Sequence, residues 1–269
     1  MHYSLSNSLG RPYVSGLDPD AKAYISAITT EGATLTGAQK SAISDFVIAE
    51  KAASRWTGLK RLYLPVWGVA AANAICMKSL TSGTFVGGVT HGAGYVQSDG
   101  STGYFDSGTK PSDVGQTMAG ASCFRLILEE ILGNNYNGAV DPSGSFFFGT
   151  NSANLICVVG TIAGVSSASD ERGISVYSRT STTGLDIYKR DSAGFTTVGS
   201  DPTLDTGVLP AVNMFFAGAR NGNGTPGIWA TTSKDGLYGM ALGLDSSASA
   251  AFTLNLKTLW ETVTGLTLP

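Results

Sequence analysis

The stretch TGAQKSAISDFVIAEKAASRWTGLKRLYLPVWG (Thr36–Gly68), followed by THGAGYVQSDGSTGYFDSG (Thr90–Gly108), decides the fold. The first part carries apolar residues, including Ile43, Phe46 and Val47, at the spacing of an amphipathic helix. The second part alternates short apolar groups with Gly, Ser, Thr and Asp, which is typical of strands joined by tight turns. We therefore expect a short helical segment that leads directly into a large antiparallel β domain.

Two helices are expected before the β domain. Asp18 followed by a proline is typical of a helix N-terminus and predicts a helix over residues 19–29. Thr36 predicts the N-cap of a second helix, over residues 37–57, which ends before Gly58. The side chains expected to face inward, beyond those named above, are Ala23, Tyr24, Ile28, Ala53 and Trp56.

From Gly68 onward the chain predicts strands. Short apolar runs bounded by Gly, Asn, Asp and Ser recur about every 10 to 15 residues, which is the spacing of an all-β sandwich or jelly roll. The run CFRLILEEIL, residues 123–132, fits a helical turn as well as a strand, and Asp245 could cap a last helix before Gly265. The strand residues expected in the core are Phe146, Phe148, Ile156, Val158, Ile174, Val176, Ile187, Phe215 and Trp229.

The predicted fold is mainly β, a two-sheet antiparallel jelly-roll sandwich with a short helical N-terminal segment and a C-terminal helix. Residues 1–17 are polar and turn-rich, and we interpret them as an irregular N-terminal arm. Residues 18–67 form the helical segment packed on the sandwich, and residues 68–269 form the jelly-roll domain.

The composition favours a protein with neutral surfaces. Charged residues make up only 14% of the 269 residues, below the roughly 25% of soluble domains, and the net charge is −3. Because the sequence shows no basic patch, nucleic acid is not expected as a partner. The window Leu62–Ser98 contains one charged residue, Lys78, so we expect it to be buried or at an interface. No apolar run is long enough for membrane insertion, and the N-terminus lacks the features of a signal peptide.

Three widely spaced cysteines, Cys76, Cys123 and Cys157, are expected to be free thiols. Their number is odd, no CxxC motif is present, and Cys76 and Cys157 lie in apolar runs. Buried free thiols suggest that the protein assembles in a reducing cytoplasm.

The sequence contains no convincing catalytic or metal-binding motif. His91 is the one histidine outside the N-terminal arm, no GxSxG motif accompanies it, and a structural hydrogen bond is its expected role. Asp99, Asp106 and Asp113 could ligate calcium, but aspartates in loops more often cap turns. We therefore predict that the protein is not an enzyme and holds neither a metal nor a cofactor.

Glycoside hydrolysis remains a lesser alternative. Its nearest candidate acids are Glu129 and Glu130, which would point to opposite faces of a strand, and the loop residues Asp170 and Glu171. The segment Gly222–Gly227 matches GxGxxG formally, but its proline and the apolar residues that follow predict a turn between strands.

Two stretches have the composition of a carbohydrate-binding surface. Sugars are held by aromatic rings that stack on their apolar faces and by side-chain amides that bond their hydroxyl groups. The candidate ligand-binding residues, found in residues 134–137 and 221–229, are Asn135, Tyr136, Asn221, Asn223 and Trp229. Turn formation by the asparagines and core packing of the tryptophan are the alternative interpretation.

Several motifs resemble those of a group of structural proteins from tailed bacteriophages and prophages. They include DPDAKAYISAIT, LTGAQKSAISDFV, the pattern W-x-x-L-K-R-L-Y-L-P-V-W-G and GGVTHGAGYVQSDGSTGYFDSG. Residues 103–107 occupy the family's TGYxDT-like segment, with Ser107 in place of the usual threonine. The resemblance covers residues 18–263, is most specific in its first third and is weakest over residues 129–200.

The resemblance implies a concanavalin A-like (laminin G-like) jelly roll in a virion protein assembled in the host cytoplasm. A tail-fibre or tail-tip protein that binds host surface glycan is the leading expectation, and a capsid decoration or head-fibre protein that binds other virion proteins is the alternative. A homo-oligomer is expected, and trimers are common in such fibres. The family has no agreed catalytic residues that could be transferred.

Overall fold

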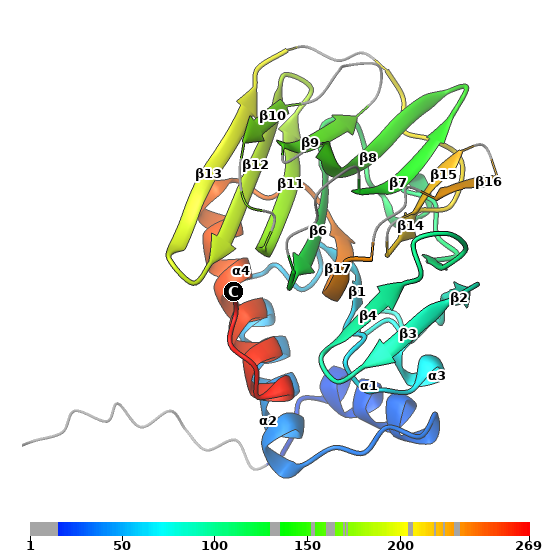
Figure 1. Ribbon diagram of the computed structural model, residues 1–269. Helices are drawn as coiled ribbons and strands as arrows, with labels where there is room; N and C mark the ends of the chain where they lie inside the picture. Colours follow the sequence, from blue (N-terminus) through cyan, green and yellow to red (C-terminus); the bar gives the residue numbers. More distant parts are fainter. Residues whose placement is uncertain are drawn as a thin grey trace, which may run out of the picture.

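The computed structural model shows a mainly β protein in which two large sheets pack face to face and helices cover one of them (Figure 1). We call the sheet next to the helices the inner sheet and the other the outer sheet. The residues that the structure describes are 16–129, 135–151, 154–159, 165–168, 170, 172–203, 207–217, 219–222, 224–228 and 232–269.

The helices begin at the predicted capping residues. The Asp18 side chain accepts a hydrogen bond from the backbone at the start of α1, and Thr36 and Gln39 form a reciprocal capping box at the start of α2. Asp245 caps α4, which ends at the left-handed Gly265. The C-terminal helix is thereby confirmed. The helices are α1 (Pro19–Thr30), α2 (Gly37–Ala52), α3 (Ala70–Asn73), the 3-10 helix η1 (Ser112–Val114) and α4 (Ser246–Thr264).

Two predictions about the helices were wrong in detail. Helix α2 ends at Ala52 rather than at residue 57, because Ser54 adopts a left-handed backbone and the chain turns back onto the Glu50 carbonyl. Ala53 is therefore exposed at the end of the helix. Ala23 is exposed as well, because α1 buries the face that carries Ala21, Tyr24, Ile25 and Ile28.

The inner sheet is antiparallel throughout its described pairs. Strand β17 is central: it pairs with β6 along one edge and with β4 and then β1 along the other. Strand β1 lies within residues 18–67, so the sheet begins inside the segment that the sequence assigned to the helical part. The strands in spatial order are β13 (Gly194–Asp201), β12 (Gly184–Asp191), β11 (Gly173–Ser181), β6 (Ala121–Ile127), β17 (Lys234–Ala241), β4 (Tyr95–Ser98) and β3 (Val89–Gly92), with β1 (Leu59–Tyr63) beside β17.

The outer sheet contains one parallel pair, β15 with β7, among its described strands. Strands β15 and β16 form a hairpin at Gly222 and Thr225, which confirms that the GxGxxG match is a turn between strands. The strands in spatial order are β10 (Val165–Ala168), β9 (Asn154–Val159), β8 (Gly144–Asn151), β7 (Asn135–Asp141), β14 (Phe215–Phe216), β5 (Tyr104–Asp106) and β2 (Thr84–Val86), with β15 (Ala219–Gly222) beside β7 and β16 (Thr225–Ile228) beside β15.

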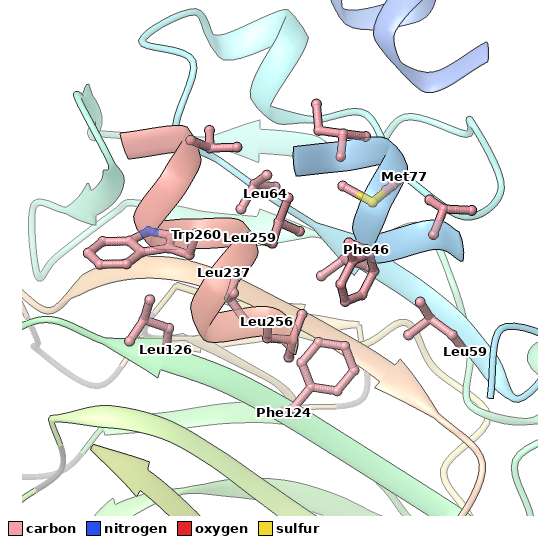
Figure 2. Close-up of a cluster of buried hydrophobic side chains, with 14 of the residues drawn as sticks. Phe46, Leu59, Leu64, Met77, Phe124, Leu126, Leu237, Leu256, Leu259 and Trp260 are labelled. Atoms are coloured by element: carbon pink, nitrogen blue, oxygen red, sulfur yellow. The ribbon is translucent and has the colours of Figure 1, made fainter. Parts of the chain in front are cut away.

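The central strands of the inner sheet are buried on both faces. Every residue of β6 is buried, so the run CFRLILEEIL contributes a strand rather than a helical turn. One face of β6 presents Phe124 and Leu126 to α2 and α4, where Figure 2 shows them beneath Phe46, Leu256 and Leu259. The other face presents Ala121 and Cys123 to the outer sheet. Full burial of such a side chain contributes about 1.5 to 3 kcal/mol.

Six of the nine predicted core residues are buried, but two strands place their side chains differently from the prediction. In β9 the buried residues are Leu155 and Cys157, whereas Val158 is half-buried on the other face. Phe215 is buried on the face of the outer sheet that points away from the inner sheet, and its neighbour Phe216 enters the core. The side chain of Ile156 and all of Trp229 lie outside the described residues.

The charge-poor window Leu62–Ser98 divides into two parts. Residues 62–66 and 72–77 are buried, as expected, whereas most of residues 79–94 are exposed or half-buried around β2 and β3. The three cysteines are buried free thiols, which confirms that prediction. Among the described helices, none combines the length and apolar character needed to cross a membrane.

Candidate functional site

The outer sheet carries a row of aromatic side chains on the face turned away from the core. Side chains alternate between the two faces of a strand, and residues paired across strands share a face. Phe146 and Phe148 enter the core, so Phe147 between them points outward. The pairs Phe147–Gly138 and Gly138–Phe215 then place Phe215 on the same outer face.

Four rings form this outer aromatic face: Tyr104, Tyr136, Phe147 and Phe215. Phe215 is 4% exposed and Tyr136 is 8% exposed, whereas Tyr104 and Phe147 are half-buried. Tyr104 stacks on Phe215 with ring centroids 4.7 Å apart, and Phe147 meets Tyr136 edge to face at 5.6 Å. Each half-exposed ring therefore rests on a buried ring, which fixes its orientation before any ligand binds.

The absence of a side chain at Gly138 permits this arrangement. Its φ is +134°, and a Cβ atom there would lie 2.2 Å from the Phe146 carbonyl oxygen. Gly138 occupies the row between Phe215 and Phe147, so no side chain stands between these two rings. The row from β5 to β8 crosses three strand spacings, about 14 Å. Tyr104 on β5 and Phe147 on β8 thus stand on strands that lie further apart than the width of one sugar ring.

Polar groups accompany the aromatic rings at the β5 end of the row. Asp106 pairs with Phe215 in the sheet, accepts a hydrogen bond from the Gly108 backbone at 2.8 Å and lies 3.4 Å from the Asn213 amide nitrogen. Burial, and then the Asp106 charge, raise the pKa of the Tyr104 hydroxyl, which stays protonated as a donor. Rings that stack and groups that donate and accept hydrogen bonds are what a sugar requires.

The two stretches predicted to bind ligand lie on neighbouring strands, but the pairing joins residues 220–222 to residues 138–140, beyond the stretch 134–137. Strand β15 pairs with β7, and Asn221 lies opposite Ala139 although the two are distant in sequence. The Asn221 amide is engaged within the fold: it donates to the Asn213 carbonyl at 3.0 Å and accepts from the Gly224 backbone at 2.8 Å. Its role in ligand binding stays a prediction.

Among the other predicted ligand-binding residues, Tyr136 belongs to the outer aromatic face, where it supports Phe147. The backbone of Asn135 pairs with Thr150 in the sheet, but its side chain lies outside the described residues. Asn223 and Trp229 also lie outside them. Their predicted roles stay predictions.

Tyr104, Phe147 and Phe215 are not among the site residues predicted from the sequence. The signal for Phe147 was nevertheless present, because the middle residue of three consecutive phenylalanines in a strand must face away from the other two. Phe215 next to Phe216 carries the same signal. The stacking of Tyr104 on Phe215 joins strands that are more than a hundred residues apart, and strand spacing alone does not indicate it.

The residues considered for catalysis have structural partners. Glu129 forms an ion pair with Lys234, and Asp170 forms one with Arg172. Glu130 and Glu171 lie outside the described residues. His91 shares a hydrogen bond of 2.9 Å with Asn73, as expected, and burial lowers its pKa.

Two of the three aspartates considered for calcium, Asp99 and Asp106, accept hydrogen bonds from the backbone in turns. The Thr102 hydroxyl, and then the backbone amides of Thr102, Ser101 and Gly103, hold the pKa of the Asp99 carboxyl well below its ordinary value. Within the described part of the chain, no group of three His, Cys, Asp or Glu side chains is placed to hold a metal ion.

Comparisons with known proteins give little guidance. No family model and no curated protein matches this chain. Among solved structures it is similar to Trypanosoma rangeli sialidase, with 11% identity and a TM-score of 0.44. The match covers 82% of this chain and 39% of the sialidase chain, so this protein spans about two fifths of that length. A similarity at this level supports no inference about activity.

Proposed function

We propose that this protein is a structural component of a tailed-phage virion, of the tail-fibre or tail-tip type, that binds host surface glycan. The sandwich would then be a concanavalin A-like jelly roll. The motifs between Asp18 and Asp106 support the virion assignment through their resemblance to phage structural proteins.

The outer aromatic face is the observation that carries glycan recognition. Tyr104 on β5 and Phe147 on β8 each present a partly exposed ring that a buried ring holds in place, and their strands lie three spacings, about 14 Å, apart in the sheet. This spacing suits an extended polysaccharide with contacts to more than one sugar. In this proposal the sugar rings stack on Tyr104 and Phe147, while Asp106 and the Tyr104 hydroxyl bond the sugar hydroxyl groups.

A capsid decoration or head-fibre protein is the second candidate. A groove of about 470 Å³ runs between α2 and α4, and small side chains such as Ala38, Ala42 and Thr262 line most of it. Another virion protein could dock there, on the side of the molecule that carries the helices (Figure 1). A glycan-depolymerising enzyme is a weaker candidate, because Glu129 and Asp170 are already ion-paired.

Immunogold electron microscopy of the purified virus, with antibody against this chain, tests the proposal. Label at the tail tip is the expected result. Label over the head would favour the decoration protein, and particles without label would contradict the virion assignment. Release of oligosaccharides from host polysaccharide by the purified protein would instead identify an enzyme.

A further inference from the structure

A second candidate site lies away from the outer aromatic face, on the edge of the inner sheet where β1 begins. A pocket of about 350 Å³ is lined there by three cations, Lys60, Arg61 and Lys78, together with Thr57, Ser79 and Asp113. We call it the basic pocket. In a protein of net charge −3, whose sequence shows no basic patch, the fold itself gathers these cations.

The local structure explains why two consecutive residues reach one pocket. Neighbours in a regular strand point to opposite faces, but the register of β1 against β17 shifts between Leu59 and Arg61. Such a bulge redirects a side chain. Arg61 is fixed by a hydrogen bond from its Nε to the Thr109 hydroxyl at 3.0 Å and another to the Lys60 carbonyl at 2.9 Å.

Lys78 is tied to the same strand. The Met77 amide donates to the Leu62 carbonyl at 2.7 Å, which anchors the turn that carries Lys78 beside β1. The Lys78 ammonium lies 4.4 Å from the centre of the Trp56 ring, so the indole holds the charge at the pocket. The three cations are therefore placed by backbone pairing and ring contact.

The charge of the pocket is not neutralised within the described part of the chain. None of its three cations forms an ion pair there, whereas Lys51 and Arg55 nearby do. Burial lowers the pKa of Lys78; Asp20 opposes this effect, and the cations Lys51 and Lys60 add to it. An anion bound between these cations would offset their mutual repulsion.

Asp113 narrows the class of ligand. A carboxylate in the wall of a pocket disfavours the binding of a bare oxyanion, because the two negative charges repel each other. A carboxylate does accept hydrogen bonds from hydroxyl groups, and the Thr57 and Ser79 hydroxyls can donate or accept them. The lining therefore matches a ligand with one negative group and several hydroxyl groups.

We infer that the basic pocket binds an acidic sugar residue, with its carboxylate on Lys60, Arg61 and Lys78 and its hydroxyl groups on Asp113. The site is separate from the outer aromatic face, and the inference adds to the proposed function an acidic class of glycan.

Isothermal titration calorimetry of the full chain with methyl glucuronide, and with methyl glucoside as the neutral match, tests this inference. The glucuronide should bind about tenfold more tightly than the glucoside, because charge-assisted hydrogen bonds form only with the carboxylate. Added salt should weaken the binding of the glucuronide and leave the binding of the glucoside unchanged. Equal affinity of the two sugars, or no detectable binding of the glucuronide, would overturn the inference.

Variants locate the binding. Lys60→Met and Lys78→Met should each weaken glucuronide binding about tenfold, whereas Lys22→Met, which removes an exposed cation on α1, should leave it unchanged. Thermal unfolding of each variant checks that it is folded, and Lys60→Met keeps the test valid if loss of the Trp56 contact unfolds Lys78→Met. Equal weakening by all three variants would overturn the site assignment.

Asp113→Asn separates an acidic sugar from a plain oxyanion. The substitution removes a negative charge, so it should strengthen the binding of inorganic phosphate. It should weaken the binding of methyl glucuronide, because the sugar hydroxyl groups lose the carboxylate that accepts their hydrogen bonds. Equal strengthening of both ligands would show a site for a plain oxyanion and would overturn the sugar assignment. Substitution of Tyr104 and Phe147 should not change glucuronide affinity, so failure of the proposed function would be distinguishable from failure of this inference.

Discussion

Asp235 is a buried carboxylate whose environment makes stability depend on pH. Its side chain is 1% exposed and accepts a hydrogen bond from the Ser233 hydroxyl at 2.9 Å. Burial raises its pKa from 3.8 to about 6, against the opposing effects of Arg125 and Ser233. The folded protein therefore binds this proton more tightly than the unfolded chain does.

Asp235 should consequently contribute about 3 kcal/mol less to the free energy of unfolding once the pH has risen from 3.8 to about 6. Asp235→Asn removes the titration, so the difference in unfolding free energy between variant and wild type should change by that amount across the window. Guanidinium denaturation of both proteins at several pH values measures it. Parallel pH profiles of the two proteins would show that Asp235 does not titrate in this range.

Glu50 is a second buried charge, and it joins α2 to α4. It is 0% exposed, receives two hydrogen bonds from Arg55 at 2.8 and 2.9 Å, and receives a third from the Asn255 amide at 2.6 Å. Arg55 and Asn255 thus satisfy the buried Glu50 carboxylate with hydrogen bonds, and removal of Glu50 would leave the Arg55 guanidinium without its ion-pair partner.

Glu50→Ala should lower the free energy of unfolding by about 3 to 5 kcal/mol, because it breaks a buried ion pair. Lys257→Ala is the matched control: it breaks the half-buried pair between Lys257 and Glu261 on α4, which is more accessible to water than Glu50, and should lower the free energy of unfolding by less than about 1 kcal/mol. Chemical denaturation measures both values. Similar losses in the two variants would show that burial of Glu50 does not matter.

At the scale of elements, α4 is the helix that secures the inner sheet. Figure 2 shows Leu256, Leu259 and Trp260 of α4 in one buried cluster with Leu126 and Leu237 of the sheet. The Trp260 indole also donates a hydrogen bond to the Gly94 carbonyl at 3.2 Å, and Gly236 gives it room, because a Cβ atom there would lie 2.8 Å from the indole nitrogen.

Trp260→Ala should therefore destabilise the protein by about 3 to 5 kcal/mol, through loss of packing and the cavity left behind. Trp260→Phe keeps most of the packing and should lower the free energy of unfolding by less than Trp260→Ala does. Leu254→Ala, on the exposed side of α4, should change stability by less than about 0.5 kcal/mol. If the tryptophan and leucine variants unfold at the same temperature, α4 does not have this anchoring role.

The start of each long helix was predictable because capping is a local signal, and Asp18, Thr36 and Asp245 act as the sequence indicates. The end of α2 was not predictable, because the spacing of apolar residues does not indicate that Ser54 adopts a left-handed backbone and that the chain turns back onto the Glu50 carbonyl.

The sequence predicts which face of a strand is buried only where polar residues alternate with apolar ones. In β9 the run LICVV is apolar at every position, so either phase fits, and the structure buries Leu155 and Cys157 rather than Val158. The site was affected in a different way: Phe146 and Phe148 of β8 were correctly expected in the core, but Phe147 between them, which faces outward, was not selected as a site residue. The pairing of β7 with β15 depends on contacts between distant residues, which one sequence does not display.

At the scale of the whole molecule, the described helices cover one side of the sandwich, and none of them lies on the outer face of the outer sheet (Figure 1). The aromatic residues on that face are arranged in pairs, one buried and one half-exposed. Exposure of such apolar surface to water is unfavourable unless the face contacts a ligand. This division of roles underlies our proposal: the helical side supports the fold, and the outer aromatic face meets the ligand.

The most direct test of glycan recognition through this face is an array of bacterial surface polysaccharides, probed with wild type and with the double variant Tyr104→Ala, Phe147→Ala. Wild type should bind a polysaccharide, and loss of each ring should weaken that binding by up to about tenfold. Tyr95→Ala, a half-buried ring on the inner sheet, should bind like wild type. Unchanged binding by the double variant, or no polysaccharide bound by wild type, would contradict the account.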